Sequence, residues 1–523
     1  MTTFMRMLTF AALFWAGIAM ADGNHHAASD LDQAKLGKVH FPVSCTPAAQ
    51  TQFDKALAML HSFWYDEAEK AFQQVISTDP DCVMGYWGIA MSLYQQLWAT
   101  TPTVEEVQRA RNALAQVQPA MIKTAREKAY LDAIAIIYPP ADSHDNNSYS
   151  TRKLAYEQAM QRIAEQFPDD SEATLFYALA LISNVSLDDK TFARQKQALQ
   201  LLQRILKEEP HHPGIAHYII HSSDYPELAA LGLDAARAYT HIAPAVPHAL
   251  HMSSHIFVRL GLWQDVVHSN LAAYRASQEH ASDNYGDDIH YKDYLLYAYL
   301  QLGETEKARA IVQEILATDQ AHPHNTTIAY AFAAIPARFA AERGDWQAAA
   351  RLSIHPASFP WQQFGWCEAL TLFTKGMGAA RTGDIDGAKH SLQQLTVLRD
   401  QDRAAQQHYT AGQIEIQRLA VAAWIALAEN HAEEALQLMR MAADLEDSTE
   451  KDNVTPGSIL PARELLGELL LTLDQPAAAL KELEASLQRM PNRRNGISLA
   501  AQAAKKAGDL AKAKQYEQQF QAL

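Results

Sequence analysis

One pattern constrains this chain more than any other. Apolar residues recur at helical spacing almost throughout, in units of about 34 residues. Apolar side chains at i, i+3, i+4 and i+7 predict amphipathic helices, and strand signals are nearly absent from the sequence. A helix pair of this size cannot bury its apolar face alone, so it must stack on its neighbours. The pattern therefore predicts an all-α chain of stacked helix pairs.

The units share a register of small, turn-forming and aromatic residues. A unit that starts at residue 49 has Tyr65 at position 17, Ala68 at position 20 and Pro80 at position 32. This register resembles the tetratricopeptide (TPR) repeat, which implies a TPR-like α-solenoid of antiparallel helix pairs with a concave groove lined by the first helix of each pair. The number of repeats between residues 100 and 212 stays open. The register fits with starts at residues 49, 83, 213, 247, 289, 330, 369, 416, 460 and 494.

The first 21 residues have the pattern of a secretory signal peptide. Arg6 provides the positive charge, Leu8–Ile18 is a short apolar segment, and Ala19-Met20-Ala21 forms a small-x-small cleavage site before Asp22. We therefore expect a periplasmic or secreted protein with no stable membrane insertion after cleavage. A loop around Pro139-Pro140 and residues 144–148 separates two helical blocks. The expected organisation is a signal peptide (1–21), a lead-in (22–48), an N-terminal block (49–140), a central block (150–318) and a C-terminal block (319–523).

Charge and cysteine content exclude several classes of protein. The 523 residues include 44 Lys+Arg and 60 Asp+Glu, and the net charge of −16 argues against a nucleic-acid partner. Three cysteines are too few for a disulfide scaffold or a four-cysteine zinc site. Export permits a disulfide between Cys45 and Cys82, which flank the first repeat, and Cys367 would then be a buried thiol.

Histidines are concentrated in one part of the chain. Of 22 histidines, 11 lie between residues 211 and 290. The resemblance to TPR domains implies that positions 2, 5, 9 and 12 of each first helix line the groove. We expect His25, His26, His211 and His212 to be exposed or, for the last two, to lead into a helix. The groove positions of three consecutive repeats hold His217, His221 and Asp224, then His248, His251 and His255, then His290 and Asp293.

Converging imidazoles with one or two carboxylates are the ligands that Zn, Fe, Mn or Cu ions prefer. Positions 2, 5 and 9 fall within about 60° on one helix face, so these side chains could meet at one point. The alternative is a structural cluster held by hydrogen bonds. Four further residues are candidates for groove binding of a protein or peptide ligand, namely Trp87, Tyr94, Tyr218 and Arg259.

The segments HPGIAHYIIHSSDYPELAALGLDAARAY (212–239) and PHALHMSSHIFVRLGLW (247–263) carry a resemblance to a family of bacterial, often exported TPR-repeat proteins. That family usually has Met-Pro-Ser-His where this chain has Met252-Ser253-Ser254-His255. The resemblance implies the fold and supplies no activity. The first hypothesis is an exported binding or scaffold module with a divalent-metal site in its groove. The alternatives are a metal-dependent enzyme that acts on a small molecule at the same cluster, with catalytic residues unknown, and a protein–protein adaptor with structural histidines.

Overall fold

The computed structural model describes residues 32–97, 101–140, 148–186, 189–279, 285–319, 322–452 and 454–523. Within these ranges the chain is all-helical, with 24 α-helices, three short 3-10 helices and no strand. None of the helices searched in these ranges has the length and apolar character needed to cross a membrane. The predicted signal peptide, His25 and His26 lie outside the described residues.

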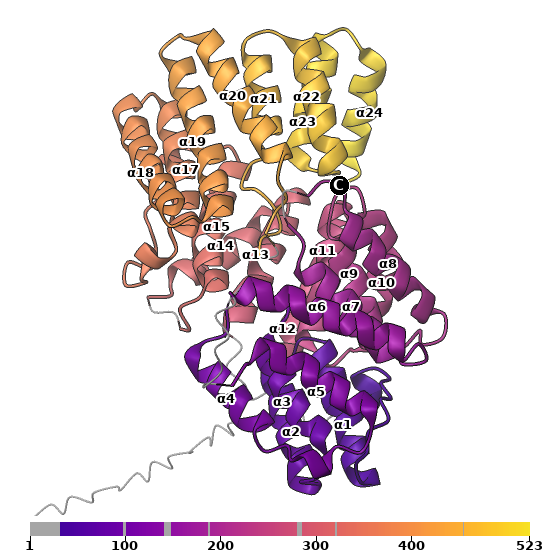
Figure 1. Cartoon of the computed structure of the whole chain (residues 1–523). Helices are drawn as coiled ribbons and strands as arrows, with labels where there is room; N and C mark the ends of the chain where they lie inside the picture. The colour runs from indigo at the N-terminus through magenta and orange to yellow at the C-terminus, as the bar shows by residue number, and fades with distance from the viewer. Residues whose placement is uncertain are drawn as a thin grey trace, which may run out of the picture.

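The helices alternate between the two members of successive antiparallel pairs, and each packs chiefly against its neighbours along the chain (Figure 1). The first members are α1 (Pro47–His61), α3 (Val83–Tyr94), α5 (Ala125–Ile137), α7 (Ser171–Ser183), α9 (Pro213–Ser223), α11 (Pro247–Arg259), α13 (Tyr285–Gln301), α15 (Thr326–Glu342), α17 (Gly365–Thr382), α19 (His408–Ala428), α21 (Ala462–Thr472) and α23 (Arg494–Lys506). The second members are α2 (Tyr65–Thr78), α4 (Val104–Leu114), α6 (Tyr149–Gln166), α8 (Ala193–Leu206), α10 (Ala229–Ile242), α12 (Trp263–Gln278), α14 (Thr305–Leu316), α16 (Trp346–Ala350), α18 (Ile385–Ala404), α20 (Ala432–Asp447), α22 (Pro476–Arg489) and α24 (Leu510–Gln521).

The predicted fold class is confirmed: the chain is a TPR-like α-solenoid. All ten predicted repeat starts fall in or within a few residues of the first helix of a pair. The segment whose repeat count was open contains α4 and two further helix pairs, α5 with α6 and α7 with α8. One large hydrophobic cluster runs from Leu36 to Ala513 through all these pairs, as expected when each pair covers the apolar face of the next.

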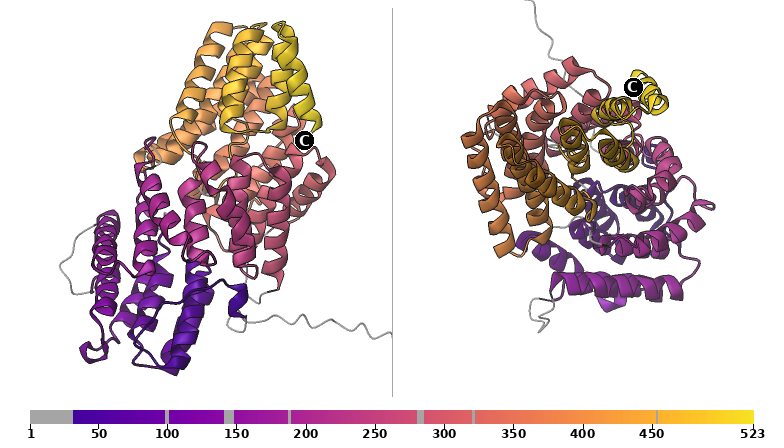
Figure 2. Two further views of the ribbon diagram at one scale, coloured as in Figure 1. Left: turned by 90° about the vertical axis from the view of Figure 1, so that its right-hand side faces the viewer. Right: turned by 90° about the horizontal axis from the view of Figure 1, so that it is seen from above.

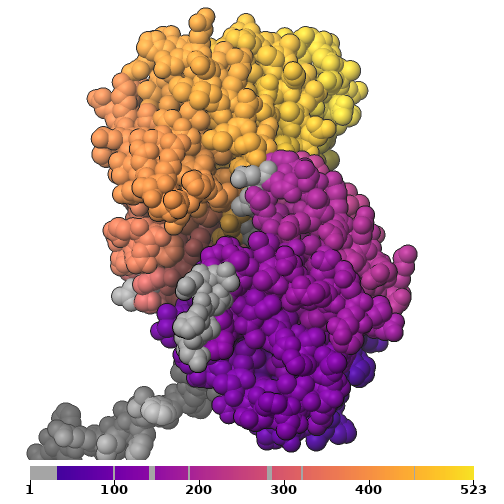
Figure 3. Space-filling view, in the orientation of Figure 1, coloured from indigo at the N-terminus to yellow at the C-terminus, as the bar shows by residue number. Residues whose placement is uncertain are grey.

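The stack curves so that the last repeats return to the middle of the chain (Figure 2). At this contact the indole of Trp263 in α12 donates to the carbonyl of Asn492, 2.7 Å away. The fully buried guanidinium of Arg493 pairs with Glu342 of α15 and donates to the hydroxyl of Tyr297 in α13. In the space-filling view the C-terminal repeats abut the central ones (Figure 3). These contacts bring residues far apart in the sequence close to the histidine-rich repeats.

Candidate functional site: two buried histidine triads

The histidine pairs of α9 and α11 occupy the same place in successive repeats. Both helices have a proline in the first turn, where its missing N–H costs no hydrogen bond, so they start in the same register. His217 and His221 lie one turn apart on α9, and His251 and His255 follow them by 34 residues on α11. The structure therefore repeats one arrangement of two imidazoles in two adjacent helix pairs.

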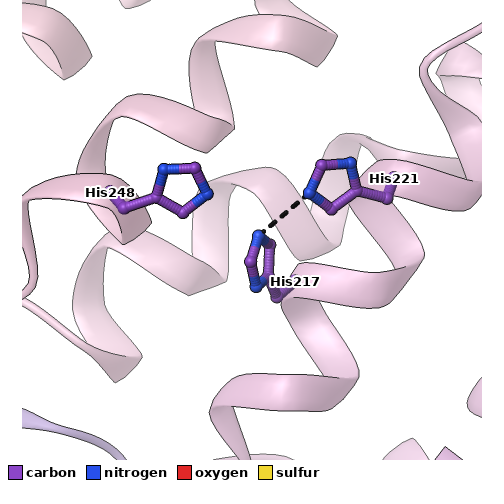
Figure 4. Close-up of side chains that lie close together, drawn as sticks. All are labelled: His217, His221 and His248. Atoms are coloured by element: carbon purple, nitrogen blue, oxygen red, sulfur yellow. Dashed lines mark hydrogen bonds between the residues drawn. The ribbon is translucent and has the colours of Figure 1, made fainter. Parts of the chain in front are cut away.

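The earlier pair forms a triad with His248, which we call triad A (Figure 4). One ring nitrogen from each of the three side chains lies within 4.8 Å of the others. The Nε2 atoms of His217 and His221 are 3.1 Å apart. The Nδ1 atom of His217 lies 2.7 Å from the backbone carbonyl of His61, which can only accept, so this nitrogen carries the proton. The lone pair of His217 is therefore on Nε2 and faces His221.

The later pair forms triad B with His290 of α13, again with one nitrogen from each ring within 4.8 Å of the others. The Nδ1 atom of His251 donates to the side-chain oxygen of Asn270, 2.7 Å away. The amide of Asn270 is oriented by its own N–H group, which donates to the carbonyl of Val266. The proton of His251 is thus held on Nδ1, and its lone pair is on Nε2.

The second imidazole of triad B is oriented in the same way. The Nδ1 atom of His255 donates to a carboxylate oxygen of Asp224, 3.0 Å away. A carboxylate accepts and does not donate, so the lone pair of His255 is also on Nε2. The Nε2 atoms of His251 and His255 are 3.2 Å apart. The hydroxyl of Tyr294 lies 3.2 Å from the Nε2 atom of His255.

Two lone pairs that face each other at this distance repel unless a cation lies beside both. The Tyr294 hydroxyl can donate its proton to Nε2 of His255. Neither that hydroxyl nor the ring of His255 then donates to Nε2 of His251. A proton could serve as the cation, but burial lowers the pKa of both His251 and His255. The separation also suits a metal, because two nitrogen ligands of a tetrahedral zinc ion lie roughly 3.3 Å apart.

Asp224 lies outside both triads and acts on the ring of His255. Its carboxylate also pairs with Arg259 and with Lys451, a residue of the segment between α20 and α21. Burial alone would raise the pKa of Asp224, but the two cations and the imidazole outweigh it and hold that pKa well below its usual range. Asp224 was predicted as a metal ligand; in the structure its carboxylate instead lies behind the ring of His255 and contacts that ring, Arg259 and Lys451.

Asp293, also predicted as a ligand, is brought into neither triad. Its nearest cation is the guanidinium of Arg338 in α15, with an N–O distance of 3.8 Å. Neither carboxylate oxygen has a hydrogen-bond partner among the described residues, and burial raises the pKa of Asp293 to about 6 against the opposing effect of Arg338. The repeat register had placed Asp293 at a groove position like that of His251. In the structure α13 directs its side chain toward Arg338 of α15 rather than toward α11.

A third group of possible ligands, formed by His61, His212 and Glu172, was missed by the sequence analysis. Its hydrogen bonds are complete without an ion. The Nε2 atoms of both histidines lie within 3.0 Å of the carboxylate of Glu172. The Nδ1 atom of His61 accepts from the hydroxyl of Tyr218, and that of His212 accepts from the N–H of Gly214. The group therefore joins α1, α7 and α9 without needing a metal.

The positions of its members explain why this group was missed. Of the two outcomes expected for His212, exposure or a position that leads into a helix, the structure shows the second: His212 is the N-cap of α9, with a buried side chain. Burial would raise the pKa of Glu172, yet its two histidines hold it well below the usual range, so the carboxylate stays ionised. His61, Glu172 and His212 come from three different repeats and share no register position that could have predicted their contact.

Three predicted groove-binding residues are core residues instead. Trp87, Tyr94 and Tyr218 are each 1% exposed. Trp87 packs edge-on against three other aromatic rings, and Tyr94 packs against Tyr156. Arg259 is also largely buried, where it pairs with Asp224. Helical spacing of aromatic residues cannot distinguish a groove from a core, and in this chain the core takes them.

The three cysteines belong to neither triad. Cys45 and Cys82 form a disulfide with a Cα–Cα distance of 4.9 Å, which joins the segment before α1 to the start of α3. Cys367 in α17 is free and buried, as expected.

No protein-family model matches this chain, and none of the curated proteins compared with it does. Three solved structures are similar over most of their length at 12% sequence identity. They are the APC/C hetero-tetramer Cut9–Hcn1 (TM-score 0.30, covering 91% of this chain and 93% of that one), the TPR domain of P58(IPK) (0.22, 88% and 98%) and a monomeric IFIT1 mutant with Gppp-AAAA (0.35, 84% and 90%). Similarity at this level carries no information about ligand or activity.

Proposed function

We propose that this chain is an exported helical-repeat protein that binds a transition-metal ion at triad B. The observation that carries the proposal is the pair of Nε2 lone pairs on His251 and His255, which face each other at 3.2 Å while both Nδ1 protons are held by acceptors on the far side of each ring. A metal ion bound by both nitrogens would remove their repulsion. The acceptors behind the rings are also the partners that usually orient histidine ligands.

The ligand set narrows the class of metal. Triad B offers three imidazoles, and both carboxylates predicted as ligands lie outside it. Imidazole suits Zn, Cu and Fe ions, whereas Mg²⁺ and Ca²⁺ require oxygen ligands. Mn, which prefers more oxygen ligands, fits this set less well. Three protein ligands would leave one tetrahedral position open to water or a small molecule.

Scaffolding of a protein partner remains part of the proposal, because helical solenoids present extended surfaces. The metal site itself is not a groove for a peptide. His217, His251 and His255 are 2% exposed or less. A partner would therefore bind elsewhere on the solenoid, and the ion would stabilise the repeats or react with a molecule small enough to reach it.

A metal-dependent enzyme is the second candidate, and one observation favours it. Arg259 and Lys451, the two cations that hold Asp224, also line a cavity between the central and C-terminal repeats. The aromatic side chains of Tyr297, Tyr330 and Trp366 share its wall. A small anionic substrate bound there would lie next to the Asp224–His255 pair. Turnover that requires both the metal and Arg259 would establish this alternative.

The proposal is tested by titrating metal-free, untagged protein with Co²⁺, whose visible absorption reports imidazole ligands and coordination number. We expect saturable binding, with the affinity at one site lowered at least 10-fold in His255→Gln and in His290→Gln. His268→Ala is the matched control, because His268 is an exposed histidine on α12. If folded wild-type protein shows no saturable absorption, or if the three variants bind alike, the proposal is wrong.

A further inference from the structure

Triad A repeats the construction of triad B one repeat earlier. In each triad, two histidines four residues apart on the first helix of a repeat are joined by a third from the first helix of the next repeat. His248 follows His217 by 31 residues, and His290 follows His251 by 39. The difference is the eight-residue insertion before the later repeat, so the two triads are equivalent in register.

We propose that triad A binds a second metal ion, so that the protein carries a pair of ions in neighbouring repeats. This inference rests on the proposed function, which requires an ion only at triad B. It goes further because the sequence pattern placed all the histidines around one point, whereas the structure divides six of them into two sets.

One donor of triad A, His217, is oriented from behind in the way that metal-ligating histidines usually are. The proton of His217 is held on Nδ1 by the carbonyl of His61, and its Nε2 lies 3.1 Å from that of His221. The ring of His61 is itself fixed at both nitrogens, by Glu172 and by Tyr218. The group formed by His61, His212 and Glu172 therefore fixes the end of α1. It thereby positions the carbonyl of His61, which orients the ring of His217.

The two triads adjoin each other. The ring of His248 lies 5.2 Å from that of His217 within triad A and 6.4 Å from that of His251 in triad B, measured between ring centroids. An imidazole that binds a metal ion is neutral, so the six histidines would supply no negative charge. The charge of Asp224 is already offset by Arg259 and Lys451. Two dications here would carry uncompensated positive charge, which is costly in a buried site. The pair therefore favours copper in its univalent state, or divalent zinc or copper with a small anion such as hydroxide.

The number of ions per chain tests this inference. Metal-free protein is loaded with Zn²⁺ or with Cu²⁺, separated from free ion by gel filtration and analysed for metal and protein. We expect two ions per chain for wild type and for His268→Ala, and one for His217→Gln and for His251→Gln. Thermal unfolding and near-UV circular dichroism confirm that each variant folds; if His217→Gln does not, His248→Ala replaces it, because His248 is only half-buried.

The outcomes separate the two proposals. One ion in wild type, lost in His251→Gln and kept in His217→Gln, would overturn the second site and leave the proposed function intact. No bound ion in wild type would overturn both. Two ions that survive in His217→Gln and in His248→Ala would also refute the assignment to triad A. As an independent readout, paramagnetic resonance of the Cu²⁺-loaded wild type should show two coupled ions, and His217→Gln should show the spectrum of an isolated one.

Discussion

Replacing Asp224 by asparagine should destabilise the contact between the central and C-terminal repeats. The substitution keeps the shape of the side chain and removes its charge. Asp224 is one residue beyond α9 and pairs at 2.8 Å with Arg259 and at 2.8 Å with Lys451, and these three side chains are only 4%, 9% and 10% exposed. Without the carboxylate, two cations stay buried with their main counter-charge gone.

The expected cost is about 3–5 kcal/mol, the range for breaking a buried ion pair by removing one partner. In a solenoid this loss falls on the repeats in contact rather than on the whole chain, so a local measurement is appropriate. Hydrogen exchange of the metal-free protein should therefore accelerate roughly 100- to 5,000-fold at the end of α9 and around Lys451. Amides of α4, which packs against α3 and not against α9, should keep their rates.

Two further variants make this prediction specific. Asp224→Asn combined with Lys451→Met should recover part of the lost protection, because one of the two stranded charges is gone. Asp132→Asn is the control, since its ion pair with Lys128 is exposed and should contribute less than about 0.5 kcal/mol. A loss of protection worth less than about 1 kcal/mol in Asp224→Asn would refute the reasoning that this carboxylate neutralises the buried cations.

Three other predictions follow. Burial raises the pKa of Asp293 to about 6 in the folded chain, against about 3.9 in the unfolded chain, so the folded state binds the proton more tightly. The free energy of unfolding should therefore fall by about 2–3 kcal/mol as pH rises from about 4 to about 7. In urea titrations at several pH values, Asp293→Asn should flatten this dependence. A Cβ at Gly232 would lie 2.2 Å from the hydroxyl oxygen of Ser223, so Gly232→Ala should cost about 1–3 kcal/mol, and an unchanged melting temperature would contradict this. Cys45→Ser with Cys82→Ser opens a loop with a sequence separation of 37 and should cost about 3–4 kcal/mol in denaturant unfolding, with reduction of the wild type having the same effect.

The helix pairs could be predicted where turn residues mark them. Glycines with positive φ, among them Gly261, Gly303 and Gly344, stand between the two helices of a pair and set the register. The sequence has no glycine between Gly88 and Gly214. In this segment the first helices also begin 42 to 46 residues apart rather than 34, at residues 83, 125, 171 and 213. A search with a fixed period and a glycine marker therefore could not place α5 to α8.

The histidine site was predictable in part, because the repeat register also fixes where its histidines lie. Register placed both histidine pairs correctly on one helix face, because the two repeats follow each other without an insertion. It could not show that the face divides into two triads, because that depends on which rings of α9, α11 and α13 meet in the packed structure. Nor could it find Asn270, on a second helix, or Lys451, which is 227 residues from Asp224. These partners come from packing between elements, and packing leaves no periodic signal in the sequence.

The central claim is that triad B holds a metal ion, and anomalous diffraction tests it most directly. Crystals of untagged protein, prepared without chelator after export from its host, would be measured above and below the absorption edges of Cu and Zn. We predict an anomalous peak about 2.0–2.1 Å from the Nε2 atoms of both His251 and His255. An ordered site with no peak in metal-replete crystals, or with a peak only at surface histidines, would contradict it.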